Sequence, residues 1–241
     1  GKEIIRRLHE MGVKSEFIQI SEGVSRINLK LKSIDGTEIN GAGPVISKDK
    51  VEELMKKLEE LGEGDVLFLA GSIPSSMPDD MHEQIMARLE GKGVMIVVDA
   101  TKDLLVNVLK YHPFLVKPNN HELGEIFGVE IKDKDDVIKY AKKLQEQGAR
   151  NVLVSMAGDG AVLVTEDAQE FKAEAPKGEL KNSVGAGDSM VAGFVYGYLK
   201  TNDYKQAFMY GVCTGSASAF SEELATKAEV DALLDKSKEI F

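Results

Sequence analysis

The chain has 241 residues, of which 43% are hydrophobic and 29% charged, a composition typical of a soluble globular protein. Forty acidic residues against thirty basic ones give a net charge of −10, which argues against nucleic-acid binding and anionic-membrane binding. The single cysteine, Cys213, excludes an intrachain disulfide, and no stretch reaches the roughly eighteen apolar residues of a membrane span. We therefore expect a cytoplasmic protein without membrane or nucleic-acid partners.

The N-terminal part of the sequence predicts a helix followed by β structure. Apolar residues at helical spacing predict a helix that ends at Gly12, and residues 16–20 are expected to form a strand. Residues 24–32 alternate between apolar and polar side chains, which predicts a strand with one dry face and one wet face. Asp35–Gly36 is a typical hairpin turn, and residues 37–40 are the predicted return strand.

After this hairpin, all-apolar strands alternate with helices, a pattern that indicates a parallel sheet covered on both faces. The predicted helices are 48–61, 79–89, 122–127, 135–147, 188–200, 203–220 and 228–238. The predicted strands are 66–70, 94–98, 114–116 and 152–154, with a late antiparallel pair at 161–165 and 170–173. The expected fold class is α/β, a doubly wound, mostly parallel sheet with helices on both faces, plus a small β segment at residues 16–43.

The segment 182–194 gives the strongest indication of chemistry. Gly185 and Gly187 precede an apolar helix, so free backbone N–H groups and the helix dipole can bind anionic oxygen there. A carboxylate at that place, Asp188, suits a general base that takes a proton from a hydroxyl attacking phosphate. An ordinary helix N-cap explains the same residues equally well. The sequence contains neither GxxxxGK[ST] nor GxGxxG, the main patterns of P-loop and dinucleotide-binding proteins.

A second segment, Lys117–Glu122, can bind a metal or cap a helix. Asn119 and Glu122 stand three residues apart at a predicted helix start, hence on one side of its first turn. Their oxygens suit Mg²⁺, usually held through water. The same pair is typical of a capping box, and the pattern taken alone favours that interpretation.

Further candidate residues follow strands or lie on the hairpin. Ser155–Gly160 can cradle nucleotide phosphates or form a tight turn. Ser72 suits a phosphate or sugar oxygen, or simply belongs to a strand exit before Pro74. Arg26 can bind a phosphate through two hydrogen bonds or be a solvated cation. Asp99, which also ends a strand, has a structural interpretation.

Together these segments resemble the ribokinase-like (PfkB) carbohydrate kinases, whose C-terminal signature contains Gly-Ala-Gly-Asp. The resemblance covers nearly the whole chain. In order, the similar segments are Ser25–Lys30, Thr37–Gly41, Gly71–Pro74, Lys117–Leu123, Val154–Ala161 and Ser183–Phe194. The Arg-Ile-Asn and Thr-Glu-Ile-Asn-Gly sequences resemble those of the family subgroup that phosphorylates ketohexose phosphates.

The resemblance implies a role for each candidate residue. Asp188 would deprotonate the sugar 6-hydroxyl, and the anion hole for the transferred phosphoryl group would consist of Gly185, Ala186 and Gly187. The implied ATP-binding residues are Lys117, Ser155, Ala157, Gly158, Gly160 and Gly187. The sugar phosphate would be bound by Arg26, Ser72 and Asp188, and Mg²⁺ would be held through water by Asn119 and Glu122.

The implied reaction converts fructose 1-phosphate to fructose 1,6-bisphosphate with ATP and Mg²⁺. Phosphorylation of tagatose 6-phosphate is one alternative. Non-catalytic binding of a nucleotide or sugar phosphate is another, because the family pattern begins with a strand carrying a sugar-binding Asp and a Gly-Gly-Lys-Gly-x-Asn segment. This sequence has neither feature and, judged against the family pattern and usual domain size, is expected to start about 60–70 residues later.

The resemblance also implies how the chain is organised. Residues 1–241 are expected to form one N-terminally incomplete kinase domain, with residues 16–43 as part of a β lid. That lid would also make the contact of a homodimer.

Overall fold

The computed structural model describes residues 1–30 and 38–241. The chain divides into two compact units, one of residues 1–63 and 72–93, the other of residues 64–71 and 94–241. The first unit contains α1 (Lys2–Glu10), β1 (Asn28–Lys30), β2 (Glu38–Asn40), α2 (Lys48–Leu58) and α3 (Met81–Leu89).

The prediction of a strand at residues 16–20 is wrong. No strand in the described part of the chain pairs with this segment, and an unpaired strand leaves its backbone groups unsatisfied. The Glu16 side chain instead extends to α2, where its carboxylate pairs with the Lys57 ammonium at 3.0 Å. The segment therefore runs as irregular chain.

The β hairpin is confirmed within the described residues. Strands β1 and β2 are antiparallel, with Leu29 opposite Ile39. The Gly41 N–H donates to the Ile27 carbonyl at 3.1 Å, and a Cβ on Gly41 would lie only 2.7 Å from that oxygen. Glycine is therefore needed where the two chains approach. The predicted turn Asp35–Gly36 lies outside the described residues.

The hairpin face predicted to be dry is exposed in this chain. The exposed fractions are 79% for Ile27, 50% for Leu29 and 57% for Ile39. Three apolar side chains on one small hairpin thus lie open to solvent.

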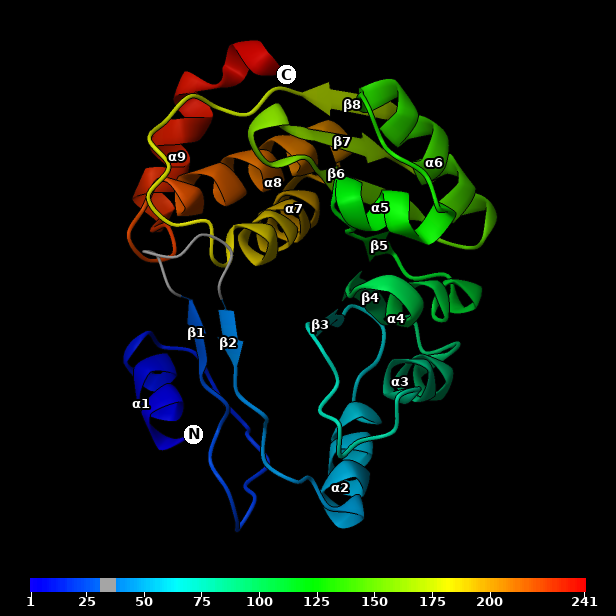
Figure 1. The fold of residues 1–241 in the computed structure, drawn as a ribbon, viewed down its shortest axis with the longest axis vertical. Helices are drawn as coiled ribbons and strands as arrows, with labels where there is room; N and C mark the ends of the chain where they lie inside the picture. Colours follow the sequence, from blue (N-terminus) through cyan, green and yellow to red (C-terminus); the bar gives the residue numbers. More distant parts are fainter. Residues whose placement is uncertain (31–37) are drawn as a thin grey trace. The chain divides into compact units, whose positions relative to one another are not determined.

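The described residues of the second unit form a six-stranded sheet in the order β3-β4-β5-β6-β7-β8 (Figure 1). The strands are β3 (Val66–Ala70), β4 (Met95–Asp99), β5 (Leu115–Val116), β6 (Asn151–Ser155), β7 (Ala161–Val164) and β8 (Glu170–Ala173). The first four are parallel, and β7 and β8 continue antiparallel. The predicted α/β class and the late antiparallel pair are confirmed.

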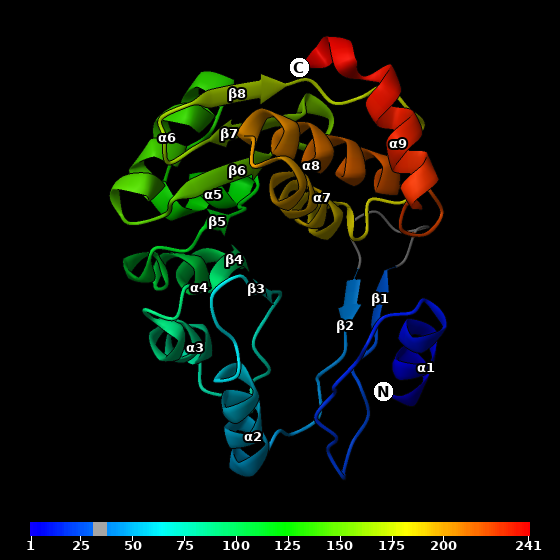
Figure 2. The same cartoon turned by 180° about the vertical axis from the view of Figure 1, so that it is seen from behind.

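Helices cover both faces of this sheet, as Figures 1 and 2 show from opposite sides. One face is covered by α7 (Ala186–Thr201) and α8 (Tyr204–Ala219), the other by α5 (Asn120–Phe127) and α6 (Lys134–Glu146). The remaining helices are α4 (Lys102–Val106) and α9 (Lys227–Lys236), with short 3-10 turns at Leu109–Tyr111, Ala157–Asp159 and Lys238–Ile240.

Successive residues of each strand point to opposite faces of the sheet, and those on one face form a core with α7 and α8. Leu153 and Leu163 pack with Phe194 and Phe208 of α7 and α8, and all four are essentially inaccessible to solvent. The residues flanking Leu153 are buried valines that point to the opposite face. Both faces of β6 are therefore dry from Val152 to Val154, which is why this strand is apolar there.

Candidate active site

The polar residues of the second unit gather where its parallel strands end. Asp99 is the last residue of β4, Lys117 follows β5, and Ser155 is the last residue of β6. An isolated parallel bridge joins Asn119 to Ser155, so the segment after β5 lies beside the end of β6. Ligands of doubly wound sheets bind beyond these carboxyl ends.

Helix α7 begins at the Gly-Ala-Gly-Asp sequence. Gly185 is its N-cap, with φ +78° and ψ 1°, and the Ala186 N–H donates to the Ser183 carbonyl at 3.2 Å. Asp188 is the third helical residue, and its side chain is exposed. The predicted helix start is confirmed, and the N–H groups of its first turn form the positive end of a sixteen-residue helix.

We expect Gly185→Ala to lower the free energy of unfolding by about 1–2 kcal/mol, the usual cost of the left-handed region for a residue with a Cβ. The added Cβ would also lie 2.8 Å from Leu224 Cδ2. Urea denaturation measures the change. The matched control is Gly158→Ala, because a Cβ on Gly158 meets nothing within 4 Å. Equal stability of the two variants would contradict the role assigned to Gly185.

Lys117 brings a positive charge to the start of α7. Its side chain is only 8% exposed, and its ammonium lies 3.2 Å from Asp99 Oδ1. A Cβ placed on Gly187 would lie 3.4 Å from Lys117 Nζ. The structure thus brings Lys117 and Gly187, two predicted phosphate-binding residues, into one place.

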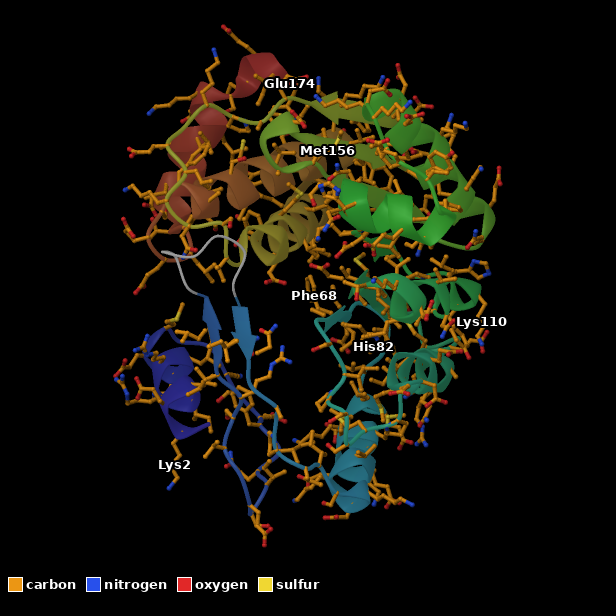
Figure 3. The ribbon with its side chains drawn as sticks, in the orientation of Figure 1. Lys2, Phe68, His82, Lys110, Met156 and Glu174 are labelled. Atoms are coloured by element: carbon orange, nitrogen blue, oxygen red, sulfur yellow. The ribbon has the colours of Figure 1, made fainter. Side chains whose placement is uncertain are left out.

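Asp99 belongs to the same cluster, although the sequence suggested only a structural role. Burial raises the pKa of the Asp99 carboxyl, the Lys117 ammonium lowers it, and the charges of Asp188 and Glu122 raise it. Asp99 and Asp188 also line a cavity of about 200 Å³ with apolar side chains of β3, β4 and α7. Phe68 of β3, labelled in Figure 3, lies on the wall of this cavity. Its position at the end of a buried strand is the sequence signal that could have assigned Asp99 to the site.

Asn119 and Glu122 form the capping box that their spacing indicates. The Glu122 N–H donates to Asn119 Oδ1, and the Asn119 N–H donates to Glu122 Oε2, both at 2.8 Å. Within residues 1–30 and 38–241, no three His, Cys, Asp or Glu side chains group as metal ligands. A Mg²⁺ ion near this pair would therefore need oxygens from water and phosphate as well, which is its usual coordination.

We expect Glu122→Gln to raise the Mg²⁺ concentration needed for half-maximal rate, because the variant loses a carboxylate near the proposed metal. Glutamine still completes a capping box, so the thermal midpoint should stay near that of the wild type. A Mg²⁺ titration of the initial rate measures the effect. An unchanged Mg²⁺ dependence would leave the pair with its helix-capping role alone.

The segment Ser155–Gly160 connects the antiparallel strands β6 and β7. The Met156 N–H donates to the Gly160 carbonyl at 2.9 Å, and Gly160 has φ +89°. A Cβ on Gly160 would lie 2.0 Å from the Ala173 carbonyl oxygen, so only glycine fits. The tight-turn interpretation is confirmed. Ala157 and Gly158 are exposed on this turn, and their contact with ATP stays a prediction.

The first unit brings together the two predicted sugar-phosphate residues. Arg26 Nη1 donates to Ser72 Oγ at 3.0 Å, and both side chains are exposed. Arg26 lies just before β1 instead of within the predicted strand. A guanidinium and a hydroxyl side by side form a suitable site for a phosphate group.

In this fold a Gly-Ala-Gly-Asp helix start lies beside the ends of parallel strands. Residues 1–230 match the model of the pfkB family carbohydrate kinases, and the chain belongs to that family. It is therefore an enzyme of the carbohydrate-kinase class, which implies ATP as the phosphoryl donor.

Individual relatives are closely similar. The chain is 48% identical to 1-phosphofructokinase of Bacillus subtilis (strain 168) over 99% of its own length and 78% of that protein. It is 32% identical to D-tagatose-1-phosphate kinase of Bacillus licheniformis, covering 96% of this chain and 76% of the relative. A Staphylococcus aureus structure described as a candidate phosphofructokinase superposes with a TM-score of 0.87 at 40% identity, over 97% of this chain and 76% of that one.

No helix in the described part of the chain is both long and apolar enough to cross a membrane.

Proposed function

We propose that the protein transfers the γ-phosphoryl group of ATP to the 6-hydroxyl of fructose 1-phosphate and so forms fructose 1,6-bisphosphate. The observation that carries this proposal is the 48% identity to a 1-phosphofructokinase over 99% of the chain. The position of Asp188 in the first turn of α7, near Asp99 and Lys117, supports it.

In the proposed reaction, Asp188 accepts the proton of the 6-hydroxyl as that oxygen bonds to the γ-phosphorus. The bond between the γ-phosphorus and the bridging oxygen breaks, and ADP leaves with the electron pair. The N–H groups of Gly185 and Gly187 and the Lys117 ammonium stabilise the charge on the transferred group, whereas the Ala186 N–H already donates to the Ser183 carbonyl. Such a reaction depends on positioning and electrostatics more than on covalent chemistry by the protein.

ATP and Mg²⁺ are assigned to the ends of β5 and β6. The exposed turn with Ala157 and Gly158, together with Ser155 and Gly160, is proposed to contact the nucleotide. Asn119 and Glu122 fit a water-mediated Mg²⁺ site, because each keeps oxygen lone pairs beyond the capping hydrogen bonds. The ion would neutralise charge on the β- and γ-phosphates.

The phosphate already on the sugar is assigned to Arg26 and Ser72. Their hydrogen bond at 3.0 Å keeps the guanidinium and the hydroxyl together before the substrate arrives. A phosphate can accept from both groups, and a charge-assisted bond to Arg is stronger than a neutral one. This pair would select phosphorylated sugars over free ones.

A second candidate substrate is tagatose 1-phosphate, which differs from fructose 1-phosphate only in configuration at C4. The 32% identity to a D-tagatose-1-phosphate kinase favours including it. The Arg26–Ser72 pair would bind the 1-phosphate of either sugar, so discrimination would have to arise near C4.

We also propose that residues 1–241 belong to one ribokinase-like kinase domain of a cytoplasmic homodimer, with residues 16–43 as part of its β lid. The exposed Ile27, Leu29 and Ile39 support a contact through the hairpin, because association would bury them.

Identification of the product tests the proposed function. The full-length protein is incubated with ATP, Mg²⁺ and fructose 1-phosphate, and phosphorus NMR follows the sugar and nucleotide signals. We expect fructose 1,6-bisphosphate and ADP in equal amounts. Hydrolysis of ATP without formation of fructose 1,6-bisphosphate would reject the assignment.

A further inference from the structure

The strand register places Asp99 and Lys117 side by side. Val98 of β4 pairs with Val116 of β5, so the next residue of each strand is its neighbour across the sheet. The Lys117 N–H donates to the Val98 carbonyl at 3.1 Å. The Gly71 N–H donates to the Asp99 carbonyl, also at 3.1 Å, which ties Asp99 to the end of β3. The backbone of the pair is therefore fixed from both sides.

The Lys117 side chain is buried, with 8% exposed, and the Asp99 side chain is 20% exposed. The Lys117 ammonium lies 3.2 Å from Asp99 Oδ1. A buried ammonium without a nearby opposite charge is strongly unfavourable. The Asp99 carboxylate thus determines where the Lys117 ammonium is held.

The Lys117 ammonium is held beside the first turn of α7. A side-chain atom on Gly187 would meet Lys117 Nζ at 3.4 Å. Both the ammonium and the N-terminal end of the helix are positive, so they repel each other until an anion arrives. The Asp99 carboxylate offsets this repulsion and holds the ammonium where a phosphoryl group would meet it together with the N–H groups.

We infer that Asp99 is a positioning residue, which fixes the Lys117 ammonium against the start of α7 so that it stabilises the transferring phosphoryl group. The inference rests on the proposed phosphoryl transfer but concerns a residue outside the proposed catalytic set. Asp99 acts through Lys117 and has no contact of its own with the reacting atoms.

A double-mutant cycle of Asp99→Asn and Lys117→Met tests this dependence. We expect Asp99→Asn alone to lower kcat by about 10- to 100-fold, because small misplacements of a catalytic group have effects of this size. In the Lys117→Met background, Asp99→Asn should not change kcat.

Two outcomes would overturn the inference. The first is a wild-type kcat in Asp99→Asn. The second is an equal loss of kcat in both backgrounds, which would mean that Asp99 acts independently of Lys117, for example on the metal. If Asp99→Asn fails to fold, Asp99→Glu keeps the charge and shifts the carboxylate. We then expect a lower kcat at an unchanged melting temperature, and a wild-type kcat would equally refute the role.

Calorimetric ATP titration without sugar separates this inference from the proposed function. A wild-type protein that binds ATP but does not phosphorylate fructose 1-phosphate would refute only the function. Asp99→Asn changes the charge beside Lys117, so we expect its effect on the Kd for ATP to differ between the wild-type and Lys117→Met backgrounds. An equal effect on the Kd in both backgrounds would refute the positioning role.

Discussion

Replacing Asp188 by asparagine is expected to lower kcat by about 10²–10⁴-fold, the usual effect of losing a general base. Asparagine is nearly the same size, and the substitution leaves the N-cap residue Gly185 in place, so the start of α7 should persist. The substitution removes only the ability to accept the hydroxyl proton. The Kd for ATP should hold or fall, because a negative charge beside the γ-phosphate is lost.

Steady-state kinetics with nucleotide titration and thermal melting measure these effects. Asp203→Asn is the matched control, because Asp203 also lies at a helix start in the same unit, where its side chain accepts from the Gln206 N–H. That variant should keep wild-type kcat. An Asp188→Asn protein with more than about a tenth of the wild-type kcat would leave Asp188 as a helix-start residue only.

Replacing Arg26 by alanine should raise the KM for the sugar phosphate roughly 10- to 150-fold, since a hydrogen bond to a charged group contributes about 1.5–3 kcal/mol. The KM for ATP should stay near that of the wild type. Arg26 is exposed and has Ser72 as its hydrogen-bond partner, so its loss should not unfold the protein.

A matched control for Arg26 is Arg7→Ala, an exposed arginine of α1 that pairs with Glu3. Its loss should leave both KM values unchanged. Initial rates over a range of sugar concentrations at saturating ATP provide the comparison. An Arg26→Ala protein with a wild-type KM for the sugar phosphate would show that the guanidinium does not bind the substrate.

The regular elements of the second unit could be predicted because burial and periodicity are visible locally. The helix predicted at 203–220 is α8 at Tyr204–Ala219, and the strand predicted at 94–98 is β4 at Met95–Asp99. Uniformly apolar strands and amphipathic helices carry their environment in their sequence. Helix α4 (Lys102–Val106) was missed because five residues are too few to display a helical period.

Pairing between distant segments could not be predicted in the same way. The strand expected at 16–20 has β propensity, but a strand exists only with a partner, and partners are a property of the whole fold. The same limit applied to the site. The capping box of Asn119 and Glu122 could be predicted from spacing, whereas the contact of Asp99 with Lys117 depends on β4 and β5 being neighbours.

The most direct test of the proposed function compares kcat/KM among candidate acceptors. The full-length protein is assayed with ATP and Mg²⁺ on fructose 1-phosphate, tagatose 1-phosphate, fructose 6-phosphate, tagatose 6-phosphate and ribose, with ADP release as the common readout. We predict the highest kcat/KM for fructose 1-phosphate and the lowest for ribose, which has no phosphate for Arg26 and Ser72. A kcat/KM for fructose 6-phosphate or ribose equal to or above that for fructose 1-phosphate would contradict the proposal.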